Sequence, residues 1–141
     1  MKKPTSFGIW ANTDKKVFWD TFPSIIDWAK KNNLQLFVTT RIESRLKNSD
    51  FDYKLIKNAD DFNKVDFVLS LGGDGTILSL ARAVAERGTP ILGIHLGELG
   101  FLAEVVLNDM YSRMGEVLNG DFLIQKRMAI KCSVLNKNGS K

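Results

Sequence analysis

Residues 66–76 read DFVLSLGGDGT, and this stretch decides the fold. Its first part, residues 66–71, is almost continuously apolar, as is typical of a parallel strand that is buried on both faces. The second part is a loop in which three glycines surround one acid. Residues 77–87 then carry apolar side chains at helical spacing, and Gly88 follows as a stop signal. A strand, a glycine loop and a helix in this order predict the central unit of an α/β domain.

On both sides of this unit, predicted strands alternate with predicted helices. Further strands are expected at 6–11, 34–39, 53–56 and 91–94, and further helices at 16–31, 41–47 and 108–118. Pro23 interrupts the first helix, which therefore either kinks there or starts near Thr21. The alternation predicts a layered α/β domain with a mainly parallel sheet and helices on both faces.

The end of the chain follows a different pattern. Residues 122–135 alternate between apolar and polar side chains, which predicts one long strand, and the turn signal at 136–139 predicts a returning strand. A strand of this length needs a partner along its edge. We therefore divide the chain into an α/β domain, residues 1–120, and the opening strand of a second domain, residues 121–141. Either another subunit covers the edge of this strand or the chain is part of a longer protein, and we expect the latter.

The composition is that of a globular protein, with 44% hydrophobic and 26% charged residues. No apolar run approaches the ~18 to 20 residues of a membrane span, and the apolar stretch near the N-terminus is too short for a signal peptide. We expect a cytoplasmic protein with no membrane partner. Cys132 and His95 are single residues of their kinds, which excludes an internal disulfide and the usual His/Cys zinc sites. We assign no metal ligand.

The charges are distributed unevenly along the chain. Residues 1–120 carry 15 basic and 15 acidic side chains, whereas residues 121–141 carry five basic ones against Asp121. A nucleic-acid-binding surface usually combines a basic patch with interleaved aromatic residues, but this segment offers only Phe122. We interpret the basic end as a solvated segment and expect no nucleic-acid partner.

The glycine loop has the features of a phosphate site. Ligands of α/β sheets bind at the carboxyl ends of strands, glycines allow close backbone approach and positive φ, and a helix N-terminus favours phosphate. A carboxylate would repel a bare phosphate, so Asp74 is expected to face a metal ion or a hydroxyl that attacks phosphorus. There it could orient and deprotonate the nucleophile. The alternative is a tight turn in which Asp74 or Thr76 caps the helix.

A second glycine-rich stretch, residues 93–102, reads GIHLGELGFL and also follows a predicted strand. It should therefore lie beside the first loop on the same edge of the sheet. We expect Phe101 to present an aromatic face on which a nucleobase can stack. Leu99 and Leu102 are expected to return to the core, and His95 to be a hydrogen-bonded residue at a strand end.

The two stretches together resemble the NAD kinase family. Residues 72–76 look like its GGDG(T/N) motif, and residues 93–102 look like its GI(N/H)xGxLGFL stretch. Phosphofructokinases and diacylglycerol and sphingosine kinases share the first motif, whereas the second points to NAD kinases. The similarity covers roughly residues 6–135. It implies a layered, Rossmann-like α/β domain, followed in the family by a second, β-rich domain of which residues 121–141 would be the first strand.

The resemblance also implies an activity, which is transfer of the γ-phosphoryl group of ATP (or polyphosphate) to the 2′-hydroxyl of the adenosine ribose of NAD, with Mg²⁺ or Mn²⁺. Asp74 would hold this ribose and act as general base. Gly75 would contact the same nucleotide, and Phe101 would pack on the adenine. Gly72, Gly73 and Thr76 would face phosphates. NAD and ATP would be the partners, and family members are homo-oligomers, dimers or tetramers.

Two features depart from the family pattern. The chain ends before the Asn-Glu/Asp motif of the family's second domain, so we expect it to be inactive alone. Ser79 stands where many members carry Arg or His, which puts one phosphate contact in question. Three alternatives stay open: a kinase of lipids or sugars that shares the first motif, a non-catalytic nucleotide-binding module, and an α/β interaction domain whose glycine loops are empty turns.

Overall fold

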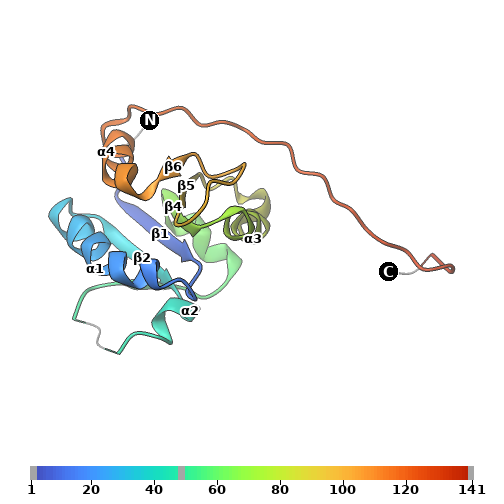
Figure 1. The fold of residues 1–141 in the computed structure, drawn as a ribbon, viewed down its shortest axis with the longest axis horizontal. Coiled ribbons are helices and arrows are strands. Elements are labelled where there is room, and N and C mark those ends of the chain that lie inside the picture. The colour runs from blue at the N-terminus through green and yellow to red at the C-terminus, as the bar shows by residue number, and fades with distance from the viewer. Residues whose placement is uncertain (1–2, 48–49, 140–141) are drawn as a thin grey trace.

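The computed structural model describes residues 3–47 and 50–139, and its centre is one six-stranded sheet in the order β3-β2-β1-β4-β5-β6 (Figure 1). The strands are β1 (Ser6–Ala11), β2 (Gln35–Thr39), β3 (Lys54–Ile56), β4 (Phe67–Gly72), β5 (Ile91–His95) and β6 (Val105–Val106). All neighbouring strands run parallel. This confirms the predicted parallel α/β sheet, and the strand order is that of Rossmann-like domains. The two-residue strand β6 was not predicted.

Helices cover both faces of the sheet, as parallel connections require. The α-helices are α1 (Lys16–Lys31), α2 (Thr40–Glu43), α3 (Asp74–Val84) and α4 (Met110–Asn119). Three 3-10 helices complete the fold: η1 (Ala59–Lys64), η2 (Ala85–Arg87) and η3 (Leu107–Asp109). The side chains of α1 and α4 share a core on one face, and those of α3 and η1 share a core on the other.

Strand β4 contributes to both cores because successive side chains of a strand point to opposite faces. Leu69 belongs to the core under α1 and α4, together with Phe18 and Met114. Val68 belongs to the core under α3, together with Leu80. All six residues of β4 are buried, which explains why its sequence is almost continuously apolar.

Helix α1 does not have the later of the two predicted starting points. It begins at Lys16 and runs through Pro23 to Lys31, so a start near Thr21 is wrong. Its buried residues lie on both sides of the proline: Phe18, Phe22, Ile25 and Ala29. Burial of this continuous apolar face outweighs the hydrogen bond that the proline removes.

The strand predicted at residues 122–135 is wrong for this structure. These residues follow α4 as an extended segment that leaves the body of the molecule, and within the described ranges they belong to no sheet (Figure 1). The pattern indicated a strand, but a strand forms only beside a neighbour that accepts its hydrogen bonds. Leu123 and Met128 are therefore 95% and 89% exposed. The domain boundary near residue 120 stays a prediction.

Among the described residues, no helix has the length and apolar character to cross a membrane.

Candidate functional site

The two glycine-rich stretches lie at the same edge of the sheet. Strands β4 and β5 are neighbours with Gly72 opposite His95, and the Leu96 N–H donates to the Gly72 carbonyl at 2.9 Å. Both loops therefore leave the carboxyl ends of adjacent parallel strands, where ligands bind in this class of fold. The predicted proximity of the two loops is confirmed.

The first loop passes directly from β4 into α3. Gly73 is the N-cap of α3 and Asp74 already lies in the first turn, with no side-chain capping hydrogen bond. The alternative in which Asp74 or Thr76 caps the helix is therefore wrong. Asp74 sits at the positive end of the helix dipole, which favours a negative charge.

The Asp74 carboxylate turns to the second loop. Its Oδ2 accepts the Phe101 N–H at 2.8 Å, and its Oδ1 accepts the Leu102 N–H at 3.0 Å. The hydrogen bond from the Phe101 amide, followed by that from the Leu102 amide, holds the pKa of Asp74 below its usual value, so the carboxylate is ionised at neutral pH. A carboxylate offers about four acceptor positions. The amides of the second loop, to which Ala103 also contributes, leave part of this capacity for further donors.

Two glycines are required by close packing within the site. A Cβ at Gly72 would lie 2.2 Å from Thr76 Oγ1 and 2.8 Å from Thr76 Cβ. A Cβ at Gly100 would lie 2.3 Å from Asp74 Oδ1. The Thr76 side chain therefore packs against the backbone of Gly72, and the Asp74 carboxylate packs against the backbone of Gly100.

Three other glycines leave open space. A Cβ at Gly73, Gly75 or Gly97 would meet no described atom within 4 Å. None of the glycines in these two loops has a positive φ, because the positive-φ glycines of the described chain are Gly88, Gly120 and Gly139. The expectation of positive φ in the first loop is wrong. Close packing explains Gly72 and Gly100, and the open backbone at the other three glycines leaves room for the close approach of a ligand.

The apolar side chains of the second loop point outward. Phe101 is 98% exposed, so its ring is accessible for stacking. Leu99 is 73% exposed and Leu102 is 37% exposed, so the expectation that they return to the core is wrong. Ala103 is the residue that becomes buried. Because Asp74 binds the backbone of the loop at the rim of the sheet, the side chains there remain in solvent.

His95 is buried at the end of β5, and the Nδ1 atom of its ring lies 3.4 Å from the Gly97 carbonyl oxygen. Its Nε2 has no hydrogen-bond partner among the described residues, and the same holds for the buried Ser70 Oγ. The hydrogen bond predicted for His95 is thus present on one side of the ring only.

Ser79 lies one turn beyond the first loop. Its hydroxyl accepts the Trp10 Nε1–H at 3.0 Å and donates to the Thr76 carbonyl at 2.9 Å. These contacts connect the first turns of α3 to β1.

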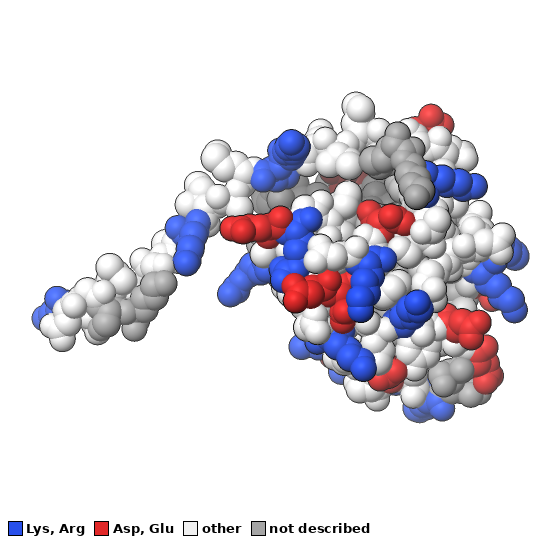
Figure 2. Space-filling view, turned by 180° about the vertical axis from the view of Figure 1, so that it is seen from behind, with Lys and Arg blue, Asp and Glu red and all other residues white. Residues whose placement is uncertain are grey.

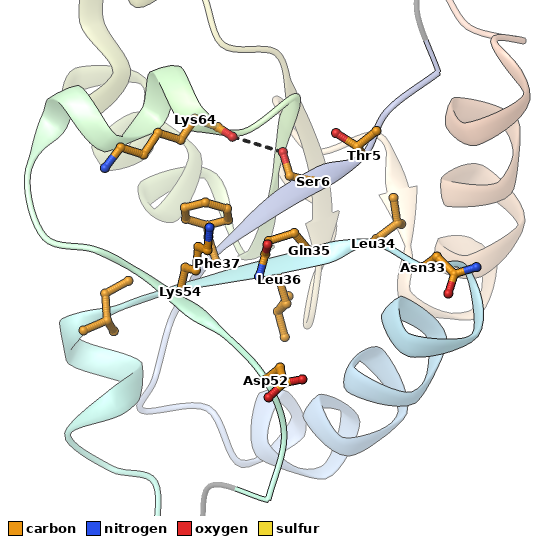
Figure 3. A pocket seen from close by; sticks show the side chains of 11 residues that line it. Thr5, Ser6, Asn33, Leu34, Gln35, Leu36, Phe37, Asp52, Lys54 and Lys64 are labelled. Carbon is orange, nitrogen blue, oxygen red and sulfur yellow. Dashed lines mark hydrogen bonds between the residues drawn. The ribbon is translucent and has the colours of Figure 1, made fainter.

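A cavity of about 800 Å³ lies far from both loops. It is lined by residues at the amino ends of β1 and β2, including Ser6 and Gln35, and by Lys54 and Lys64 (Figure 3). Its Ser6 hydroxyl donates to the Lys64 carbonyl at 3.1 Å. Because ligands of such sheets bind at the opposite edge, this cavity is not the candidate site.

The charged groups of the described residues include both signs (Figure 2) and form no three-membered cluster for a metal ion. Within residues 3–47 and 50–139, no group of three His, Cys, Asp or Glu side chains could hold a metal ion. Basic and acidic side chains are interspersed on the body in the face shown in Figure 2. The extended segment contacts the second loop region through an ion pair of 3.4 Å between Arg127 and Glu104.

The decisive contacts of the site were not predictable from the sequence. Phe101 was expected to act through its ring, yet its amide and that of Leu102 are what bind Asp74. Backbone amides carry no sequence signature. The roles predicted for Asp74, Gly75 and the phosphate-facing residues remain predictions.

Comparisons with known proteins agree with this architecture. The family described as ATP-NAD kinase N-terminal domain matches the chain over residues 7–122. The chain is 35% identical to the NAD kinase of Moorella thermoacetica over 127 residues, which are 90% of this chain and 40% of that protein. It is 30% identical to the NAD kinase of Thermoanaerobacter pseudethanolicus over 131 residues, which are 93% of this chain and 45% of that protein.

A solved structure has a similar fold. It is the yeast NADH kinase in complex with NADH, with a TM-score of 0.71 and 20% sequence identity, over 86% of this chain and 40% of that chain. The chain thus spans less than half the length of the curated relatives quoted above.

Proposed function

This chain belongs to the NAD kinase family, and we propose that it forms the nucleotide-binding part of an enzyme that phosphorylates NAD. The reaction transfers the γ-phosphoryl group of ATP (or polyphosphate) to the 2′-hydroxyl of the adenosine ribose. One observation carries the proposal. An ionised Asp74 lies at the carboxyl edge of the sheet, between the open glycines of α3 and the exposed ring of Phe101.

The Asp74 carboxylate is suited to hold the accepting sugar. Backbone amides of the second loop use part of its acceptor capacity, and the remaining part accepts hydroxyl protons of the ribose. The oxygen–phosphorus bond forms as the bond from the γ-phosphorus to ADP breaks, and the hydroxyl proton passes to Asp74. Because the pKa of Asp74 is lowered, this carboxylate is a weak base. It therefore takes the proton late, after bonding to phosphorus has acidified the hydroxyl.

The neighbouring residues supply the other contacts. Gly73 presents open backbone to a phosphate at the N-terminus of the 11-residue helix α3, where the dipole favours a negative charge, and the open backbone of Gly75 contacts the same nucleotide as Asp74. Gly72 and Thr76, which pack on each other, complete the phosphate-facing loop. The ring of Phe101 stacks on the adenine, a contact worth about 1–3 kcal/mol per base.

A divalent cation, Mg²⁺ or Mn²⁺, belongs to the proposal through the family alone. The described residues contain no three-ligand cluster, so they do not form a protein-built metal site, and we assign the cation no step here. A homo-oligomeric assembly is likewise proposed from the family resemblance. The cytoplasmic location expected from the sequence stays a proposal.

A coupled assay of the longest polypeptide that contains this chain tests the function. ATP is supplied with NAD, fructose 6-phosphate or diacylglycerol as acceptor. We expect NADP as the product, and a loss of about 10²–10⁴-fold in kcat for Asp74→Asn. Phosphorylation of a sugar or lipid in place of NAD would favour the related kinases. Full activity of Asp74→Asn would favour a different base or a non-catalytic module. Residues 1–141 alone are expected to form no NADP.

A further inference from the structure

The second half of the second glycine loop is attached to the body mainly through hydrogen bonds. Leu96 at the start of the loop packs against the core, whereas the apolar side chains beyond it are exposed, Leu99 by 73%, Phe101 by 98% and Leu102 by 37%. Burial of these side chains therefore contributes little to the conformation of the loop. The hydrogen bonds from Phe101 and Leu102 to Asp74 connect its far end to helix α3.

The carboxylate fits against the loop because residue 100 has no side chain. A Cβ on Gly100 would lie 2.3 Å from Oδ1, 2.6 Å from Cγ and 2.7 Å from Oδ2 of Asp74. All three atoms of the carboxylate would have to move, and that movement would break both amide hydrogen bonds. Gly97 is in the same loop, but a Cβ there would meet no described atom within 4 Å. An added Cβ therefore meets the Asp74 carboxylate at Gly100 but not at Gly97.

We propose that Asp74 has a second, positioning role, in which its carboxylate anchors residues 97–102 and so fixes the position of Phe101. We call its hydrogen bonds with the Phe101 and Leu102 amides the clasp. Gly100 is the residue that lets the loop close on the carboxylate. The inference rests on the proposed function in so far as Phe101 is the platform for the adenine. One acid then assembles both halves of an adenosine site, because the group that holds the ribose also positions the surface for the base.

The clasp is tested on the chain without nucleotide by NMR. The readouts are the amide proton shifts and the hydrogen exchange rates of Phe101 and Leu102. In Gly100→Ala the carboxylate is still present but displaced, and we expect both amides to exchange faster by about tenfold or more and to lose the downfield shift of a charge-assisted hydrogen bond. Gly97→Ala is the matched control and should leave both amides as in the wild type.

Asp74→Asn provides the second variant in case Gly100→Ala does not fold. Its side chain has nearly the same shape but offers one acceptor in place of two, so at least one of the two amides should exchange faster. Slow exchange in β4 shows that the fold is intact. Unchanged amides in Gly100→Ala and Asp74→Asn, or equal effects of Gly97→Ala and Gly100→Ala, would overturn the clasp.

The outcome is independent of the substrate. If the amides respond as expected but the enzyme does not phosphorylate NAD, the clasp stands and the proposed function fails. If NADP forms but the amides do not respond, the proposed function stands and Asp74 has no positioning role.

Discussion

Gly72→Ala is the substitution for which the structure gives the most specific expectation. The new Cβ would lie 2.2 Å from Thr76 Oγ1, 3.2 Å from Thr76 Cγ2 and 2.8 Å from Thr76 Cβ. Rotation of the threonine side chain moves the first two atoms but not its Cβ. Carbon atoms pack at about 3.5–4.0 Å, so the end of β4 or the first turn of α3 has to shift.

That shift is opposed by the contacts of Gly72. Its carbonyl accepts the Leu96 N–H at 2.9 Å, and the residue pairs with His95 of β5. Overpacking of this kind costs about 1–3 kcal/mol. We expect the free energy of unfolding to fall by about 2 kcal/mol, and the melting temperature by roughly 6–10 °C for a body of this size.

Denaturant unfolding and thermal melting of Gly72→Ala and three further variants check this expectation. Gly73→Ala is the control, because a Cβ there meets no described atom within 4 Å and the backbone is extended. Thr76→Gly removes the colliding atoms, at a cost of about 1 kcal/mol for a glycine in a helix. In the double variant, Gly72→Ala should therefore destabilise much less than it does alone. The reasoning is refuted if Gly72→Ala melts like the wild type, or if the two effects simply add.

Four further predictions follow from individual contacts. Phe101→Ala should weaken NAD binding by about tenfold, measured by calorimetry, without lowering the melting temperature, since the ring is 98% exposed. Gly93→Ala should cost less than about 1 kcal/mol in denaturant unfolding, because its Cβ would meet the flexible end of the Ile77 side chain at 2.7 Å. The pKa of Asp61 is lowered from 3.8 to about 2, chiefly by the hydrogen bond from the Lys64 ammonium group. The ionised carboxylate therefore stabilises the fold above pH 4, and this contribution is lost as the pH falls to 2. In Asp61→Asn the free energy of unfolding should decrease less steeply between pH 4 and pH 2 than in the wild type. Deletion of residues 122–141 should change the melting temperature of the chain by less than about 2 °C, because the side chains of residues 122–139 are largely exposed.

The local parts of the fold were predictable because local physics determines them. The apolar run of β4 and the glycines after it indicated a buried strand, a loop and a helix in the observed order. The position of the second loop also followed, since neighbouring parallel strands place their carboxyl ends together. These inferences need only the period of the pattern and the geometry of a parallel sheet.

The contacts that shape the site depend on residues far apart in the chain. Asp74 binds amides 27 and 28 residues away, and no side-chain pattern indicates an amide as a partner. Leu99 lies in the same loop and is 73% exposed, so its expected burial was wrong. Residues 122–135 show the converse, because alternation indicates a strand but cannot indicate whether a neighbour is present.

The most direct test of the central claim is a structure of NAD bound to the longest polypeptide that contains this chain. We predict that a hydroxyl of the adenosine ribose lies within hydrogen-bond distance of the Asp74 carboxylate and that the adenine lies against the Phe101 ring. NAD bound in the cavity at the amino ends of the strands, or bound at the glycine loops with its ribose turned away from Asp74, would contradict the account.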